Sequence, residues 1–242
     1  MSNSDASDAI KIKEESQKQE TDSEIKEMVR NAVHFGHKKT RQHPKMSAYI
    51  FGVRNTVSII DLEKTQEKLR VALEFLKKTK DDGKVILFVD TVPSTAGETR
   101  KIAEEIGMPY VAERWSGGTI TNWKTITTRI EHLKDLEMSR SSEDWEKYTK
   151  KERKNIGDEI IKLNKSWGGI KNMNNLPDVV FVVNMKEDEL AVKEARMRNI
   201  KVVAIADTNV DPELADYPIP ANDDALSSVK YILNRVKEAL LK

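Results

Sequence analysis

Asp90, Asn184 and Asp207 each come directly after a run of apolar residues. Where such runs form parallel strands, ligands gather beyond the carboxyl ends, and a carboxylate there can bind Mg²⁺ or accept a phosphoryl group. These three residues therefore define an enzyme hypothesis. Asp and Asn at such positions are also explained as turn and helix-cap residues, because their side chains accept hydrogen bonds from nearby backbone N–H groups. We favour the capping interpretation.

The sequence offers little else that a catalytic site needs. It contains neither standard Gly-rich phosphate loop, no Gly-x-Ser-x-Gly turn and no cysteine that could act as nucleophile or metal ligand. A catalytic site normally combines several such elements. We therefore predict no catalytic residue and no cofactor.

His34 and His37 could bind a metal ion together with Asp90 or Asp207. Their spacing of three suits one face of a helix, but Gly36 between them indicates that the helix ends there. No third ligand stands at a fixed spacing from the two histidines. We therefore predict a packed or surface histidine pair and no metal site.

The segment between Met28 and Ile60 carries basic residues and no acidic residue. Its polar and aromatic side chains, such as Gln42, Tyr49 and Asn55, could contact phosphate, sugar or an unpaired base. An ordinary basic loop would have the same composition. As an RNA-binding surface the segment would use six side chains: Lys38, Lys39, Arg41, His43, Lys45 and Arg54.

The candidate residues lie among alternating strand and helix patterns, which are typical of a parallel sheet built from crossover units. The alternation is interrupted by two consecutive helical patterns, with apolar residues every three or four positions. We predict one α/β domain at residues 25–121 and 174–242, with a flavodoxin-like sheet, helices on both faces and an inserted antiparallel coiled-coil hairpin at residues 122–173. Strand patterns cover residues 49–53, 57–60, 84–89, 110–112, 177–183 and 201–206.

The predicted hairpin carries 12 basic and nine acidic residues, and its most basic point is residues 150–154, near the tip. Phosphate contacts made by a projecting tip would position the protein on folded RNA without reading its sequence. A solvated helix surface is the alternative. The RNA-binding residues predicted here are Lys124, Lys150, Lys151, Arg153 and Lys154, together with Arg114 just before the hairpin.

The bulk composition limits the remaining classes. Its 41 basic and 40 acidic side chains give a net charge of +1, so any nucleic-acid surface must come from local segregation of charge. The absence of cysteine, of a secretory signal and of a membrane-length apolar run predicts a soluble intracellular protein. Residues 1–24 are polar and lean acidic, so we predict a disordered tail and assign it no function.

Nine short motifs resemble those of bacterial ribosomal protein S-two, and they occur in that family's order. They span the chain from about Met28 to its end, and none of them would suffice alone. The motifs are His34-Phe-Gly-His37, Pro44-Lys-Met46, Tyr49-Ile-Phe-Gly-Val-Arg-Asn55, Ile59-Ile-Asp-Leu-Glu-Lys-Thr65, Arg114-Trp-x-Gly-Gly-Thr-x-Thr-Asn-Trp-Lys-Thr125, Gly168-Gly-Ile170, Leu176-Pro-Asp178, Ala206-Asp-Thr-Asn209 and Pro220-Ala-Asn-Asp-Asp-Ala225.

The resemblance implies a flavodoxin-like sheet with a protruding hairpin. It further implies a structural role at the junction of head and body of the small ribosomal subunit, in contact with small-subunit rRNA and neighbouring ribosomal proteins. Family members also help to dock the large mRNA-binding ribosomal protein S-one. From this we expect a cytoplasmic, ribosome-bound protein that forms no homo-oligomer and contacts no membrane. An adaptor that docks proteins through its hairpin, with little RNA contact, is a further hypothesis.

Two parts of the sequence refine these expectations. Family members often carry basic residues after the strand equivalent to residues 85–89, whereas residues 90–94 are acidic and neutral here, so an RNA contact at this loop is doubtful. Trp115 and Trp123 could stack on RNA, but large aromatics usually anchor cores, and we favour packing at the base of the hairpin. The adjacent glycines Gly117 and Gly118 would let the chain turn into the hairpin or approach RNA closely.

Overall fold

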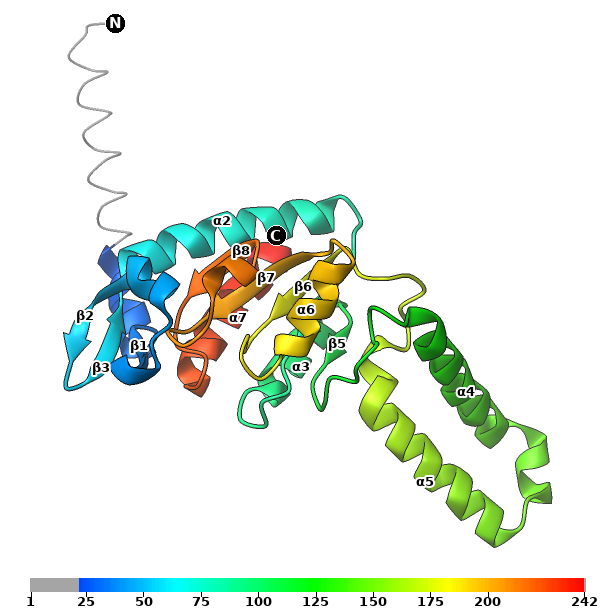
Figure 1. The fold of residues 1–242 in the computed structure, drawn as a ribbon. Helices are drawn as coiled ribbons and strands as arrows, with labels where there is room; N and C mark the ends of the chain where they lie inside the picture. The colour runs from blue at the N-terminus through cyan, green and yellow to red at the C-terminus, as the bar shows by residue number, and fades with distance from the viewer. Residues whose placement is uncertain (1–21, 242) are drawn as a thin grey trace, which may run out of the picture.

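The computed structural model describes residues 22–241 and shows an α/β domain from which a helical hairpin projects (Figure 1). Its main sheet has five parallel strands in the order β5-β4-β6-β7-β8. Counted along the chain, this is the 2-1-3-4-5 order of flavodoxin-like folds, so the predicted fold class is confirmed. The strands are β4 (Ile86–Val89), β5 (Tyr110–Val111), β6 (Val179–Val182), β7 (Lys201–Ala206) and β8 (Tyr217–Pro220).

Every residue of β4 and β6 is buried, as their continuous apolar sequences predict. Alternate side chains of these strands enter two separate cores, one on each face of the sheet. Phe88 and Phe181 lie in the first core with 5.1 Å between their ring centroids, and Leu87 and Val180 lie in the second. Helices must therefore cover both faces.

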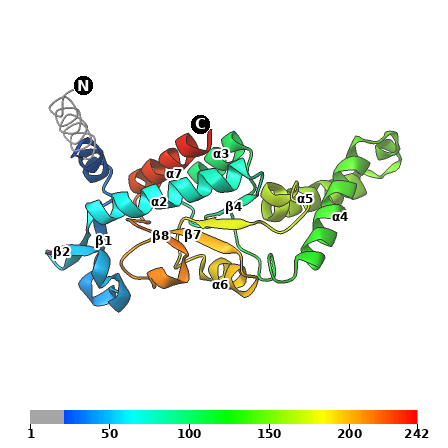
Figure 2. The same cartoon turned by 90° about the horizontal axis from the view of Figure 1, so that it is seen from above.

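Helices α2, α3 and α7 cover one face, and α6 and the base of the hairpin cover the other (Figure 2). Their ends follow the sequence. The Asp61 carboxylate accepts a hydrogen bond from Glu63 N at 3.1 Å where α2 begins, and Gly107, with φ of 71°, ends α3. The helices are α2 (Leu62–Asp81), α3 (Ala96–Ile106), α6 (Glu189–Met197) and α7 (Leu226–Leu241).

A second, antiparallel sheet in the order β1-β3-β2 lies at the end of the domain away from the hairpin (Figure 1). The predicted hairpin of β2 and β3 is confirmed, and its turn has positive φ at Asn55 and Thr56. Strand β1 is not indicated by the sequence, in which a helical pattern leads up to His34. These strands and the short helices between them are β1 (Phe35–Lys38), η1 (Lys39–Arg41), η2 (Pro44–Tyr49), β2 (Ile50–Arg54) and β3 (Val57–Ile60).

Strand β8 is also missing from the sequence-based expectation. Its sequence, Tyr-Pro-Ile-Pro, includes two residues without a backbone N–H group. The structure accommodates both prolines because β8 is the edge strand of the sheet and pairs on one side only, with β7. The short helix η5 (Pro212–Leu214) precedes it.

The hairpin consists of α4 and α5, joined by a short helix at the tip. Ile126, Ile130 and Leu133 of α4 and Ile160 of α5 are buried, as their spacing predicts. The second helix ends earlier than its apolar pattern suggests, because the chain turns after Trp167 into η4. The elements are α4 (Trp123–Ser141), η3 (Glu143–Lys147), α5 (Lys150–Trp167) and η4 (Gly168–Ile170).

The described chain begins in a helix over residues 22–30, so the helix extends into the segment for which a tail is predicted. Glu24 forms an ion pair with Arg235 of α7 and accepts a hydrogen bond from Gln66 of α2, which corrects the prediction for its last three residues. The remainder of that tail, residues 1–21, lies outside the described residues. Across residues 22–241, no helix has the length and apolar character needed to cross a membrane.

Candidate functional site

Asp90 is fully buried at the end of β4, and its carboxylate closes the turn that follows the strand. Its carboxylate accepts hydrogen bonds from Thr95 Oγ1 at 3.0 Å, from Thr99 Oγ1 at 2.6 Å and from Val92 N at 3.2 Å. Burial raises the pKa of Asp90, and these hydrogen bonds oppose the shift. Asp90 is therefore a turn residue, which is one part of the favoured interpretation, and it does not cap α3, whose N-cap is Thr95.

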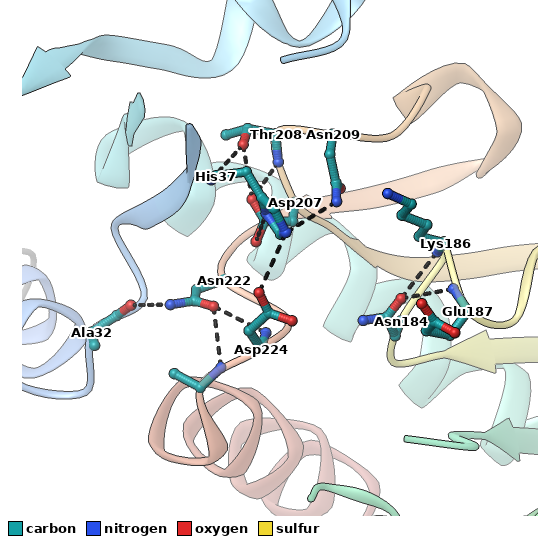
Figure 3. Close-up of polar contacts among 11 residues, drawn as sticks. Ala32, His37, Asn184, Lys186, Glu187, Asp207, Thr208, Asn209, Asn222 and Asp224 are labelled. Carbon is teal, nitrogen blue, oxygen red and sulfur yellow. Dashed lines mark hydrogen bonds and ion pairs between the residues drawn. The ribbon is translucent and has the colours of Figure 1, made fainter. Parts of the chain in front are cut away.

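Asn184 serves the same purpose at the end of β6. Its Oδ1 accepts hydrogen bonds from Lys186 N at 3.1 Å and Glu187 N at 2.9 Å (Figure 3). An amide that closes its own turn in this way is a structural element of the loop. Two of the three strand-end residues of the enzyme hypothesis therefore have local structural roles.

Asp207, at the end of β7, belongs to a polar cluster that brings together distant parts of the chain. Its Oδ2 lies 3.2 Å from His37 Nδ1, and Asp224 Oδ2 lies 3.4 Å from His37 Nε2 (Figure 3). Asn209 Nδ2 is 3.2 Å from His37 Nε2. The cluster thus joins β1, the end of β7 and the residues before α7.

Gly36 makes this arrangement possible. A Cβ on Gly36 would lie 2.4 Å from Thr208 Cγ2 and 3.2 Å from the carbonyl oxygen of Ser58. Without a side chain, β1 can approach the end of β7 closely, and His37 N donates a hydrogen bond to Thr208 Oγ1 at 2.8 Å. The residue that indicates a helix end in the sequence is therefore a point of close approach between strands.

The charges of the cluster shift the pKa values of its members. The hydrogen bond to Asp207 raises the pKa of His37, although partial burial opposes it. Burial, together with the carboxylates of Asp207 and Asp224, raises the pKa of the buried Asp223 to about 9. Burial and neighbouring negative charges both disfavour the ionised form of a carboxyl group, so the protonated form of Asp223 is favoured.

One ligand atom from each of His37, Asp207 and Asp224 lies within 4.8 Å of the other two. Imidazole nitrogen and carboxylate oxygen together suit divalent ions such as Zn²⁺. His34, which the metal hypothesis paired with His37, is not one of these three residues; its ring packs against Phe35 with 4.1 Å between ring centroids. Asp224 was not among the residues expected at this site, and the acidic pair at residues 223–224 is its one signal in the sequence.

The predicted RNA-binding residues of the N-terminal segment fall into two groups. Four of them, Lys38, Lys39, Arg41 and Arg54, are exposed on or beside the small sheet. Lys45 instead lies between two carboxylates, 2.8 Å from Asp211 Oδ2 and 2.5 Å from Glu213 Oε2. His43 is half-buried, and its Nδ1 accepts a hydrogen bond from Lys45 N at 3.4 Å.

The other predicted residues lie on the hairpin side of the molecule, at the opposite end from the small sheet (Figure 1). Arg153 is half-buried and the rest are exposed. The predicted cations therefore lie on two separate surfaces, one at the small sheet and one on the hairpin side of the molecule. Those on the hairpin side are Arg114, Lys124, Lys150, Lys151, Arg153 and Lys154.

Trp115 and Trp123 pack at the base of the hairpin, as predicted. Trp115 is 8% exposed and belongs to the core on the α6 side of the sheet, and Trp123 packs against the same core. Neither ring is fully exposed for stacking on RNA, so the packing interpretation is confirmed.

The fold places the chain in the class of flavodoxin-like α/β proteins, here with a projecting helical hairpin. A family model described as ribosomal protein S2 matches residues 28–242. The chain belongs to the ribosomal protein S2 family, whose members are structural, non-enzymatic components of the small ribosomal subunit in translation.

Three relatives support this assignment. Small ribosomal subunit protein uS2 of Coprothermobacter proteolyticus is 44% identical over 218 residues, which are 90% of this chain and 81% of the relative. Small ribosomal subunit protein uS2c of Cyanophora paradoxa is 43% identical and covers 90% of this chain and 94% of the relative. The uS2c protein of Rhodomonas salina is 45% identical, with 89% of each chain covered.

Proposed function

We propose that the chain binds small-subunit rRNA through two basic surfaces. The first, the sheet surface, consists of Lys38, Lys39, Arg41 and Arg54. The second, the tip surface, consists of Lys150, Lys151, Arg153 and Lys154. One observation carries the proposal: within residues 22–241, none of these eight cations has an ion-pair partner, although the whole chain is charge-balanced.

Unpaired cations on two well-separated surfaces suit a protein that bridges parts of a folded RNA. Each contact releases counterions from a phosphate, so affinity falls with salt in proportion to the number of contacts. Phosphate contacts fix position and orientation without reading bases, as a structural ribosomal protein requires. The ribosome in the cytoplasm is the location that follows, and no homo-oligomer is needed for this role.

Co-sedimentation tests the proposal. The full chain is mixed with small ribosomal subunits depleted of this protein, and binding is measured over a series of KCl concentrations. We expect the sheet-surface variant with Lys38, Lys39, Arg41 and Arg54 all changed to Gln to bind more weakly, with a shallower salt dependence.

Lys45→Gln is the matched control, because Lys45 is basic and lies in the same segment but is neutralised by Asp211 and Glu213. It should leave the salt dependence near that of the wild type. An unchanged salt dependence in the sheet-surface variant would remove that surface from the RNA-binding role. The same comparison with Lys150, Lys151, Arg153 and Lys154 changed to Gln tests the tip surface.

We also propose that the small sheet docks a neighbouring ribosomal protein, with ribosomal protein S-one as the candidate. Phe51 on the edge strand β2 is 81% exposed, and Val53, two residues further along the strand, is 45% exposed. An aromatic side chain this exposed on a sheet edge suits protein contact, since such rings are common anchors of interfaces.

Retention of S-one on reconstituted subunits tests this second role. Phe51→Ala should lower the amount of S-one that sediments with the subunit while leaving the chain itself bound. Met197→Ala, which changes a side chain of 73% exposure on α6, serves as the control. Equal S-one retention by both variants would exclude Phe51 as the docking residue.

A further inference from the structure

Five exposed lysines gather on one face of α5, and we name them the α5 lysine stripe. Residues three or four apart share a face of an α-helix. Steps of three or four residues connect Lys150 to Lys165 by way of Lys154, Asp158 and Ile161. At a rise of 1.5 Å per residue, the stripe is about 22 Å long. Its members are Lys150, Lys151, Lys154, Lys162 and Lys165.

The carboxyl-terminal end of the stripe leads into a groove of about 940 Å³ between α3 and α5, the α3–α5 groove. Ile161, 67% exposed, and Lys165 line it from α5, while Gly97 and Arg100 line it from α3. Four basic and two acidic side chains line the groove: Arg100, Arg140, Lys165 and Lys171 against Glu104 and Glu113.

Carboxylates within the fold pair with three of these cations. The pairs are Arg100 with Glu104 at 3.0 Å, Lys165 with Glu113 at 3.4 Å and Lys171 with Glu137 at 3.2 Å. Arg140 has no ion-pair partner within residues 22–241, and the same holds for four lysines of the stripe. The stripe and groove together therefore keep a surplus of positive charge along one continuous path.

We propose that one strand of RNA follows the α5 lysine stripe from the hairpin tip into the α3–α5 groove, with its phosphates near Arg140, Lys162 and Lys165. The proposal rests on the rRNA-binding function above and adds a path that the predicted tip residues do not include. None of the three cations belongs to the sheet surface or the tip surface.

The chemistry of the groove favours the RNA backbone over its bases. Among the described residues that line it, Tyr110 is the one aromatic residue. Its hydroxyl donates a hydrogen bond to Glu104 at 2.7 Å, and Arg100 lies over its ring at 5.7 Å. The ring is thus occupied by protein contacts, so the groove offers charge rather than a stacking surface.

Photocrosslinking identifies what lies in the groove. A photoreactive p-benzoylphenylalanine replaces Ile161 in the full chain, which is then bound to small ribosomal subunits depleted of this protein and irradiated. Met138 on α4 provides the matched control site, because its exposed fraction of 68% equals that of Ile161 within 1% and it does not line the groove.

We expect the probe at residue 161 to give a product that ribonuclease shortens, in severalfold higher yield than the probe at residue 138. A crosslink from residue 161 to a ribosomal protein would overturn the proposal in favour of a protein occupant. Equal or lower RNA yield at residue 161 than at residue 138 would also overturn it.

Charge removal gives an independent measurement. The variant Arg140→Gln, Lys162→Gln, Lys165→Gln should reduce the slope of log affinity against log salt by about two, at roughly 0.7 per phosphate on a single strand. The control changes three exposed cations of α2 that have no ion-pair partner in the described chain: Arg70, Lys77 and Lys78.

The two proposals fail in different ways. If the unmodified chain does not sediment with depleted subunits, the rRNA-binding function itself is wrong. If the unmodified chain binds and the groove variant keeps its salt slope, only the path along the groove is wrong. All substituted side chains are exposed, and circular dichroism of each variant verifies that the fold is retained.

Discussion

Trp115 Nε1 donates a hydrogen bond to Oε1 of Glu194 at 3.1 Å, across 79 residues of sequence. The same carboxylate accepts four more hydrogen bonds from the chain that leads into the hairpin: from Gly118 N at 2.8 Å and from Ile120 N, Thr121 N and Thr121 Oγ1 at 3.0 Å each. Glu194 is 4% exposed. Helix α6 thus holds the base of the hairpin through one buried carboxylate.

Glu194→Gln should lower the free energy of unfolding by about 2–4 kcal/mol. The amide keeps the size of the side chain but removes its charge, and its NH₂ group would face N–H donors. Urea denaturation measures the effect. Glu189→Gln is the control, since Glu189 lies on the same helix in an exposed pair with Lys193, 2.7 Å away, and should change stability by less than about 0.5 kcal/mol.

The contribution of Glu194 should depend on pH. Burial by itself raises the pKa of Glu194, but hydrogen bonds from Thr121, Gly118 and Trp115 outweigh it and lower the pKa below its usual 4.5. A lowered folded-state pKa stabilises the fold above the unfolded pKa, and this stabilisation disappears as pH falls through the folded pKa. The stability difference between wild type and Glu194→Gln should therefore be largest near pH 7 and shrink below about pH 4.5. A difference that does not change with pH would contradict this assignment.

The sequence predicts no metal site, but the fold brings one ligand atom each of His37, Asp207 and Asp224 within 4.8 Å of one another, so Zn²⁺ should stabilise the chain through this cluster. At 100 times the dissociation constant a bound ligand adds about 2.7 kcal/mol, which is seen as a rise in Tm. His37→Ala and Asp224→Asn should abolish the rise. His132→Ala tests for nonspecific binding, because His132 Nε2 also faces a carboxylate, 3.0 Å from Glu159, on the exposed hairpin. Equal Zn²⁺ stabilisation of all three variants would rule out the cluster.

Gly169, at the base of the hairpin, and Gly157, inside α5, should respond to alanine in opposite directions. A Cβ on Gly169 would lie 2.2 Å from the carbonyl oxygen of Tyr110, so Gly169→Ala should destabilise the fold by about 1–3 kcal/mol. Gly157 lies inside α5 with nothing within 4 Å of a Cβ, so Gly157→Ala should stabilise it by about 0.5–1 kcal/mol. Thermal unfolding of the two variants measures both signs. A Gly169→Ala variant as stable as the wild type would show that close packing at Gly169 is not limiting, and a destabilised Gly157→Ala variant would contradict the prediction for Gly157.

Local patterns in the sequence predict most elements of the main sheet. Strand β4 is recognisable because its residues are apolar on both faces, and α3 is recognisable because Gly107 ends it. Strand β1 and the edge strand β8 are not, since their sequences lack an apolar alternation and owe their conformation to pairing with β3 and β7. Strand pairing is a long-range property that a local pattern does not contain.

The candidate sites divide in the same way. The turn role of Asp90 follows from residue type and position, because its partners lie within nine residues. The cluster at His37 does not, since Asp207 and Asp224 are more than 160 residues away. The neutralisation of Lys45 is likewise set by residues 166 and 168 positions further along the chain.

The sequence by itself determined the fold class, the hairpin and the family, because burial periodicity and short motifs are written in neighbouring residues. Only the tertiary structure decided which charges are free and which are paired, and that the basic residues form two surfaces rather than one. Charges interact through space over a few ångströms, and those distances exist only once the chain has folded.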